Sequence, residues 1–391
     1  MYNVRYKRTL EIAEYFSSSN TFLKWLDLKR LSGDGNENIN ACFPKKTTGM
    51  RKDSKSHAIA GLYDRFLRYA IDIDNGVEFV QRSLEYSQHE GHFTFLDIGF
   101  APGGMVSLLL EKVPNSKGIG INLDPAKGGN VYPPQIISES RFKVLTSDVI
   151  ELARNFKEID FQALYPSLGI SKFDLVIVGI TTSGSNQKAS GDQVVDELEL
   201  KNLLHFSQLL LAFKFLNQNG KLLIRMHLGL RLVDLHILSL ILENFDHVTA
   251  TKPLTEFAMR KTFWILAEGF KGNQGVIERL AILTQPGVPA PYEAVSSDSE
   301  QLNNPILMTD SISILLEKYG TDMIRIMAPI WETQSWVLEQ IMEDRMRRIC
   351  FRCKKNNSKT LCSICRKTVP LKMARAYISV HEQLLELPKR F

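Results

Sequence analysis

A glycine-rich turn between two apolar runs is the feature that most constrains how this chain can fold. Residues 94–113 read TFLDIGFAPGGMVSLLLEKV, with three glycines between the runs. The second run repeats its apolar residues every three or four positions, so the pattern predicts a buried strand that turns directly into a helix. Glycines there let the backbone approach a ligand, and the free N–H groups of the helix start suit an anionic group. Such a turn either binds a ligand or merely connects the strand to the helix.

Strand-like and helix-like runs alternate on both sides of this turn. Residues 58–88 are predicted to form a helix before the first strand, and later helices are expected at about 193–217 and at 232–244, with amphipathic faces. The further strands are expected at 117–122, 141–145, 172–180, 221–226, 248–250 and 262–267. This alternation predicts an α/β fold, namely a mostly parallel seven-stranded sheet with helices on both faces, closed by one antiparallel pair.

Composition divides the chain into further regions. A content of 44% hydrophobic and 23% charged residues is that of an ordinary soluble protein. No apolar run is long enough to span a bilayer and the start lacks a signal-peptide core, so we expect an intracellular protein, in the nucleus or cytoplasm, without membrane contact. The expected regions are an N-terminal region of unassigned fold over 1–56, the sheet domain over 57–275, a linker or surface loop over 276–309, a helical region over 310–348 and a basic tail over 349–391.

Four of the five cysteines lie near the end of the chain with the spacing C-x2-C-x8-C-x2-C. They are Cys350, Cys353, Cys362 and Cys365. Two close pairs at this spacing suit tetrahedral thiolate coordination of Zn²⁺, whereas disulfides would need an oxidising compartment. We therefore expect a structural zinc element, which could also contact a protein partner.

Basic side chains are concentrated at the same end of the chain. Residues 345–391 contain 13 lysines and arginines against 2 acidic residues, although the whole chain carries a formal charge of only +5. A second basic run spans residues 45–55. Such runs either follow a phosphate backbone or are simply solvated, and the concentration in the tail favours RNA as a partner.

The turn has the form D-x-G-x-x-P-G-G rather than G-x-G-x-x-G, which argues against NAD or FAD. This form resembles the S-adenosylmethionine (SAM) turn of the FtsJ (RrmJ-like) family of ribose 2′-O-methyltransferases. Three later segments also resemble the family, in order: FDLVIVGI, GKLLIRMHLG and KPLTEFAMRKTFWILAEGF. The resemblance covers residues 65–271 and implies a Rossmann-like SAM methyltransferase fold.

The resemblance also implies which residues hold SAM. In this fold the ligand lies at the carboxyl ends of the strands, where acidic side chains can accept hydrogen bonds from the ribose and the adenine. A lone acid at such a place can instead be a helix cap, and Asp148 in particular has the sequence setting of one. The implied cofactor-binding residues are Asp97, Gly99, Pro102, Gly103, Gly104, Asn122, Asp124 and Asp148.

The catalytic tetrad of the family, Lys-Asp-Lys-Glu, is not matched. Its Asp falls on Gly179, its second Lys on Arg225 and its Glu on Thr262. For the first Lys there is no lysine between residues 56 and 111, and Arg68 is the nearest basic candidate. Compared position by position, this chain therefore lacks the residues that the family uses to activate the acceptor hydroxyl.

The replacement of the second lysine changes what the site can do chemically. Arg225 can hold an anion or polarise an oxygen, but it cannot accept a hydroxyl proton at biological pH. His227, two residues along the same strand and hence on the same face, is a candidate base, or else an ordinary histidine at a strand end.

Three functions remain open on the sequence. The first is a SAM-dependent methyltransferase directed to RNA, with Arg225 and His227 in the catalytic site. The second is an inactive relative that serves as an RNA- or protein-binding subunit. The third is a methyltransferase for a small molecule, for which the missing tetrad is no obstacle because positioning can supply much of the acceleration.

Overall fold

The computed structural model describes residues 11–31, 55–180, 197–229, 231–258, 260–285 and 312–352. Contacts divide the chain into two compact units. The first contains the described residues from 11 to 20 and from 55 to 330, and the second contains those from 21 to 31 and from 331 to 352. The first unit carries the glycine turn and all the strands described below.

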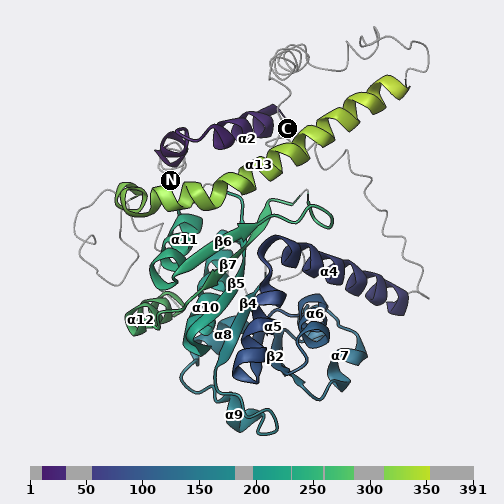
Figure 1. Ribbon diagram of the computed structural model, residues 1–391, viewed down its shortest axis with the longest axis vertical. Helices are drawn as coiled ribbons and strands as arrows, with labels where there is room; N and C mark the ends of the chain where they lie inside the picture. Colours follow the sequence, from purple (N-terminus) through teal and green to yellow (C-terminus); the bar gives the residue numbers. More distant parts are fainter. Residues whose placement is uncertain are drawn as a thin grey trace, which may run out of the picture. The chain divides into compact units, whose positions relative to one another are not determined.

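Seven strands form one sheet in the first unit (Figure 1), and the fold class predicted from the sequence is confirmed. The strands are β1 (Phe93–Ile98), β2 (Ser116–Asn122), β3 (Phe142–Thr146), β4 (Phe173–Val178), β5 (Leu216–His227), β6 (His247–Thr251) and β7 (Thr262–Glu268). Their order across the sheet is β3-β2-β1-β4-β5-β7-β6. Only β7 runs antiparallel to its neighbours, β5 and β6.

The strand order reverses between β1 and β4. From β1 the chain continues to β2 and β3 on one side, and it then returns to place β4 and β5 on the other side. In sheets of this kind ligands bind outside the carboxyl ends of the strands at the point where the order reverses. The glycine turn follows β1 at that edge.

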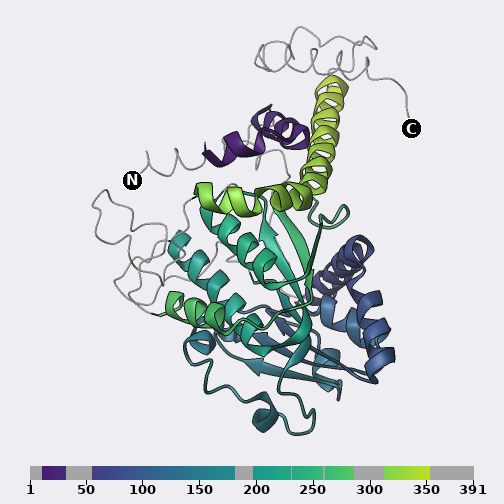
Figure 2. The ribbon, with the colours of Figure 1, turned by 60° about the vertical axis from the view of Figure 1, so that its left-hand side comes forward.

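Helices cover both faces of the sheet, as Figure 2 shows. On one face lie α4 (Lys55–Val77), α5 (Phe79–Glu90) and α6 (Gly104–Lys112). Both α4 and α5 pack on α6, and α4 also contacts β6, α5 contacts β1 and α6 contacts β2. On the other face α10 (Glu197–Phe215) packs on β4 and β5, beside α8 (Val149–Arg154) and α12 (Gln274–Leu283). The helix α11 (Leu232–Asn244) contacts β6. The shorter elements of the unit are α7 (Pro134–Ser138), α9 (Phe161–Leu164) and the 3₁₀ turn η2 (Pro125–Lys127).

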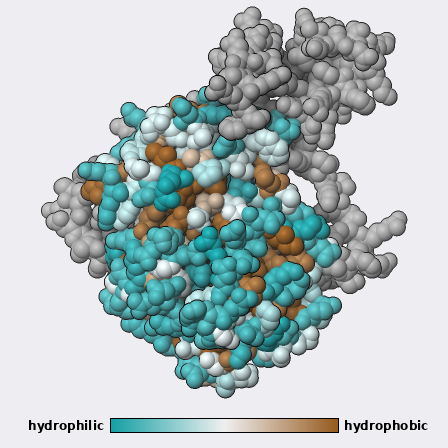
Figure 3. Space-filling model, viewed as in Figure 1, coloured by the Kyte–Doolittle hydropathy of each residue, from teal (hydrophilic) through white to brown (hydrophobic). Residues whose placement is uncertain are grey.

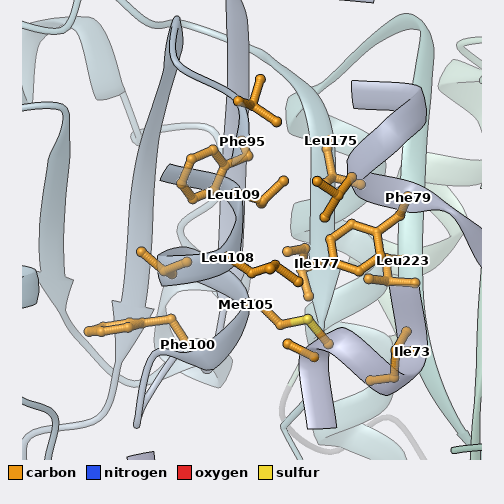
Figure 4. Close-up of a cluster of buried hydrophobic side chains, with 14 of the residues drawn as sticks. Ile73, Phe79, Phe95, Phe100, Met105, Leu108, Leu109, Leu175, Ile177 and Leu223 are labelled. Carbon is orange, nitrogen blue, oxygen red and sulfur yellow. The ribbon is translucent and has the colours of Figure 1, made fainter. Parts of the chain in front are cut away.

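A hydrophobic cluster joins the sheet to α4, α5 and α6 (Figure 4). Alternate residues of neighbouring strands contribute to it, such as Phe95 on β1, Leu175 on β4 and Leu223 on β5, because successive side chains of a strand point to opposite faces. Met105 and Leu109 of α6 face them. The cluster fixes α6, and with it the glycine turn, against the carboxyl half of β1.

Two helix predictions are corrected by the structure. The predicted helix over 58–88 is two helices, because Glu78 adopts a left-handed conformation (φ 55°) and Asp74 Oδ1 accepts a hydrogen bond from Val80 N (2.7 Å) at the start of the second. The helix over 232–244 exists, but it is buried on nearly all sides rather than amphipathic. A surrounded helix has no polar face, so periodicity alone describes it poorly.

The end of α10 also differs from the prediction. The helix was expected to continue to about residue 217, yet it ends at Phe215 and β5 begins at once. Asn219 (φ 62°) instead lies in an irregular part of β5, where the pairing with β4 shifts between Leu216 and Lys221. The turn residues therefore mark a bulge within the strand.

The described part of the second unit is helical. The sequence predicted helices over 310–348 but assigned no fold to residues 1–56. It contains α2 (Asn20–Leu31) and the later part of α13 (Ile312–Arg352). The Phe22 and Trp331 rings pack edge to face with centroids 5.0 Å apart, and Lys24 Nζ lies 3.0 Å from Glu339 Oε1. These contacts hold α2 against α13.

The surface of the described residues seen in Figure 3 is mostly hydrophilic, with separate hydrophobic patches. None of the described helices combines the length and the apolar character that crossing a bilayer requires.

Candidate functional site

The glycine turn has the backbone that its sequence predicts. Gly99 (φ 87°) follows β1, and Gly103 (φ 102°) is the N-cap of α6. Both φ values lie in the left-handed region, which glycine adopts without strain. Gly99 N donates a hydrogen bond to Ile121 O (2.8 Å), which ties the turn to the end of β2.

The glycines of the turn stand where a Cβ would not fit against the neighbouring atoms. An added Cβ at Gly99 would collide with the side chain of Ile180, and one at Gly103 would collide with the end of the Ile136 side chain. Gly104 faces backbone instead, because its Cβ would overlap the carbonyl of Phe66 on α4. The first two glycines thus allow the side chains of Ile180 and Ile136 to pack on the turn, whereas Gly104 permits α4 and α6 to pack closely.

Asp97 lies beside this turn with its carboxyl group buried. It is 3% exposed, and within the described part of the chain no hydrogen bond reaches its side chain. Burial raises the pKa of the carboxyl to about 8. A buried carboxyl without a partner at a ligand-binding edge suits a cationic group such as the ammonium of an amino acid.

The other predicted cofactor residues end β2 and β3 at the same edge. Asn122 is buried and donates to Leu123 O and Asn130 O, both at 2.9 Å. Asp124 Oδ1 accepts from Ala126 N (2.8 Å) and Asp148 Oδ1 accepts from Ile150 N (2.7 Å), so both acids are caps of short helices. In each the second carboxylate oxygen has no partner among the described residues, so capping and ligand binding are compatible.

Three of the four positions that the resemblance compares with the family tetrad come together, although their residues differ from the tetrad. Arg225 is paired with Trp264 and His227 with Thr262 across β5 and β7, and paired residues share one face of a sheet. A Cβ at Gly179 would lie 3.3 Å from Cη2 of Trp264, so the indole covers the place where a carboxylate would stand. The prediction that Arg225 and His227 share a face is confirmed.

Tyr69 of α4, which the sequence did not mark as a site residue, belongs to this cluster. Trp264 Nε1 donates a hydrogen bond to the Tyr69 hydroxyl (2.7 Å), and both side chains are 4% exposed. Burial raises the pKa of the Tyr69 phenol, an effect that Arg225 opposes. Burial also lowers the pKa of Arg225, but a guanidinium stays protonated at biological pH.

Arg68 is not in the cluster. Its Nη2 forms an ion pair with Glu256 Oε1 (2.7 Å), and its side chain is 57% exposed. The same carboxylate binds Arg65 Nε at 3.0 Å. Arg68 therefore links α4 to the loop between β6 and β7 and does not replace the first lysine.

That loop is held to α4 by more than ion pairs. Thr255 N and Oγ1 donate to Asp72 Oδ2 (2.8 and 2.9 Å), and the Phe257 ring packs on Tyr69 with centroids 5.0 Å apart. Lys252 is buried and donates to Arg260 O (2.8 Å) and Thr262 O (3.1 Å), while burial lowers its pKa to about 8. The loop thus forms a fixed wall beside Tyr69 and Arg225.

A pocket beside the ends of β4 and β5 contains a further residue that the sequence did not single out. Its polar lining residues are His205 and Gln208 of α10 together with Arg225. No sequence signal marks His205, because only the tertiary fold brings α10 to these strand ends.

The zinc prediction falls outside what the structure describes. Cys353, Cys362 and Cys365 are not among the described residues, and the side chain of Cys350 is not described either. Among the residues that are described, no group of three or more His, Cys, Asp or Glu side chains could hold a metal ion.

Several solved structures are similar to this chain. A ribosomal RNA methyltransferase, putative, from Plasmodium falciparum is 17% identical, with 50% of this chain and 97% of that one covered and a TM-score of 0.31. An O-methyltransferase family protein from Burkholderia thailandensis is 11% identical (64% and 72% covered, TM-score 0.33), and an rRNA methylase from Streptococcus thermophilus is 12% identical (46% and 88%, TM-score 0.29). No curated protein matches the sequence.

The model of one protein family matches residues 78–270, described as FtsJ-like methyltransferase. The matched range begins at the break between α4 and α5 and ends just after β7, so it includes the glycine turn and every strand of the sheet. Residues 78–270 therefore form an FtsJ-like methyltransferase domain.

Proposed function

We propose that this protein is a SAM-dependent methyltransferase that acts on RNA. The observation that carries the proposal is the glycine turn at the reversal of strand order, with the buried, unpartnered carboxyl of Asp97 beside it. The basic run at 45–55 and the basic tail, most of which lie outside the described residues, support RNA as the substrate.

The residues at the edge of the sheet fit SAM in charge and in shape. Asp97 would pair with the ammonium group of the methionine part of SAM. The glycines of the turn from Gly99 to Gly104 have no side chains, so SAM could approach the main chain there. The oxygens of Asp124 and Asp148 that the caps leave free, with Asn122, would accept from the ribose and the adenine. SAM supplies a methyl group already activated on a sulfonium, so the protein has mainly to position the acceptor.

The residues around Arg225 would hold that acceptor. The guanidinium suits a phosphate or a carbonyl oxygen, and Tyr69 stays a neutral phenol because burial raises its pKa. His227 lies one row further along the same face of β5 and is the candidate base for this proposal. Neither a lysine nor a carboxylate stands at the tetrad positions, which favours an acceptor that is easier to deprotonate than a ribose hydroxyl.

Calorimetric titration with SAM, together with tritiated SAM incubated with separate RNA, protein and small-molecule fractions, tests the proposal. We expect SAM binding that Gly103→Asp abolishes, because the new side chain meets Ile136 in a left-handed backbone. Gly91→Asp is the matched control, since Gly91 also has a positive φ (78°) but lies before β1 with no atom near its Cβ. Label in RNA supports the proposal, whereas label only in small molecules contradicts it.

The second candidate function is that of an inactive subunit that binds RNA or protein. The observation that favours it is the indole of Trp264 over Gly179, where the tetrad would have a carboxylate. SAM binding without transfer of label to any fraction would favour this candidate.

We also propose that the four cysteines of the tail hold one structural Zn²⁺, which could contribute to an RNA- or protein-binding surface. Elemental analysis should then find one zinc per chain, and Cys362→Ser should lose it.

A further inference from the structure

A cavity of about 400 Å³ lies at the edge of the sheet opposite to the glycine turn. It is bordered by the first residues of β1, β2 and β5 and by residues 168–172, which lead into β4. A strand rises about 3.3 Å per residue, so the six residues of β1 place this cavity, here called the amino-edge pocket, on the order of 20 Å from the turn. Sites for small molecules have volumes of about 300–1,000 Å³. The amino-edge pocket therefore has room for a ligand that takes no direct part in methyl transfer.

The side chains that line the amino-edge pocket have a positive net charge. They include Lys117 near the start of β2 and Lys172 just before β4, both exposed, and no aspartate or glutamate. Within the described part of the chain neither lysine forms an ion pair, and Lys117 Nζ makes a long hydrogen bond to Leu168 O (3.4 Å). A cleft lined by charges of one sign concentrates ions of the other sign. The two ammonium groups therefore favour an anion as the ligand.

A buried carboxylate next to the pocket is already fully hydrogen-bonded. Asp174 is 3% exposed, and its Oδ2 accepts from Thr94 N and Thr94 Oγ1, both at 2.8 Å. Its Oδ1 accepts from Asn217 Nδ2 (2.7 Å) and from the Tyr86 hydroxyl (3.2 Å). Four donors compensate this carboxylate inside the protein and orient Thr94 and Asn217, which line the pocket. Asp174 is thus not left to bind a cation there.

The loop before β4 supplies further hydrogen-bond donors. Within the described residues, the main-chain N–H groups of 169–172 take part in no hydrogen bond, and Ser171 is exposed. Gly169 has a left-handed conformation (φ 66°), and no atom lies within 4 Å of its added Cβ, so the main chain is open to an approaching group. Ammonium, N–H and hydroxyl groups all donate to oxygen, and a phosphate group offers three strong acceptor oxygens. This set of donors fits a phosphate group.

We propose that the amino-edge pocket binds a phosphate group through Lys117 and Lys172. The phosphate belongs either to an RNA strand or to a free nucleotide, since both present the same group to the two ammonium ions. The proposal does not rest on the proposed function, because the pocket and the edge that would hold SAM lie at opposite ends of the strands.

Paired lysine substitutions test the pocket. The pocket variant, Lys117→Gln with Lys172→Gln, removes both charges, and the control variant, Lys112→Gln with Lys157→Gln, removes as many charges from exposed positions outside the pocket. Substitutions of exposed side chains change stability little, so both variants should fold.

Calorimetry on the full chain measures the binding. The protein is first saturated with S-adenosylhomocysteine, which fills the proposed SAM site, and is then titrated with adenosine 5′-monophosphate, with adenosine and with a mixed-sequence RNA 12-mer. We expect the monophosphate to bind the wild type and the control variant equally, and the pocket variant at least about tenfold more weakly, because hydrogen bonds to charged groups are lost. Adenosine, which lacks the phosphate, should not bind.

The RNA titration identifies the source of the phosphate. If RNA affinity falls in the pocket variant but not in the control variant, the phosphate is that of an RNA strand. If only the affinity for the monophosphate falls, it is that of a free nucleotide. Equal affinities of the two variants for both ligands, or binding of neither ligand, would overturn the pocket. Tritium transfer from SAM is measured on the same proteins, and its absence from all of them would count against the proposed function and leave the pocket to the binding results.

Discussion

At the scale of single residues, two neighbours on α4 show what a sequence motif can and cannot locate. Arg68 and Tyr69 are adjacent, yet the arginine is 57% exposed in its side chain while the tyrosine is 4% exposed and bonded to Trp264. Side chains of adjacent helical residues point about 100° apart. A shift of one position can therefore move a side chain from the solvent-exposed face to the face that packs on the site. Comparison with the family tetrad led to the turn of α4 that contains Arg68, but it did not identify Tyr69 as the residue of that turn that faces inward.

The indole of Trp264 predicts how the site responds if a carboxylate is restored. Gly179→Asp would place a Cβ 3.3 Å from Cη2 of Trp264 and push the carboxylate against the ring. We expect a loss of about 1–3 kcal/mol in the free energy of unfolding, measured with urea, as for other overpacked sites. The double variant Gly179→Asp/Trp264→Phe should lose less free energy of unfolding than the sum of the losses in the two single variants. Full additivity of the two losses would show that the contact is not the cause.

At the scale of elements, strands were predicted better than helix ends. Each predicted strand from β1 to β7 exists, because buried strands are continuous apolar runs bounded by turn residues. The break at Glu78 and the end of α10 at Phe215 were missed, since a side-chain bond from Asp74 sets the first and strand pairing sets the second. The proposed cofactor residues lie at strand ends, which the sequence locates, whereas the positions of Tyr69 and His205 depend on helix packing that no local pattern encodes.

The packing of α6 on α4 gives a prediction at this scale. Gly104→Ala would put a Cβ into the backbone of Phe66 and Leu67, which cannot rotate away as a side chain can. We expect a loss of about 3 kcal/mol or more in the free energy of unfolding.

Gly61→Ala is the control for that measurement. Gly61 is also within α4, but nothing lies within 4 Å of its added Cβ, so alanine should stabilise the helix by up to about 1 kcal/mol. If both variants lose stability equally, close packing of α4 on α6 is not what requires Gly104.

At the scale of the whole sheet domain, two buried ionisable groups set opposite pH dependences. The folded pKa of Asp97 is raised from 3.8 to about 8, so the folded state keeps a proton that the unfolded state has lost, and stability falls as pH rises between these values. The folded pKa of His205 is lowered from 6.5 to about 4, so stability rises with pH over that lower range. Between pH 6.5 and 8, Asp97 is the one of these two groups whose titration still changes the free energy of unfolding.

We therefore expect the free energy of unfolding to decrease from pH 6.5 to 8, by at most about 1.4 kcal/mol per pH unit. Asp97→Asn should remove this slope in urea unfolding at four pH values. Asp160→Asn, which changes a surface helix cap to another good cap, should keep it. Saturating SAM should also flatten the slope, because a cation beside Asp97 favours the ionised carboxyl. A slope that survives in Asp97→Asn would contradict this assignment.

The contacts that join α4 to β7 and to the β6–β7 loop have a consequence for the order in which the protein folds. The ion pair of Arg68 with Glu256 and the bond of Tyr69 with Trp264 join residues 188 and 195 positions apart. Contacts that close such long loops form late, after the local helices and neighbouring strands. During synthesis residues 97–148, which the proposed function places around the methyl donor, are made before the β6–β7 loop, which it places beside the acceptor. We expect methyl-donor binding to mature before the site can accept a substrate.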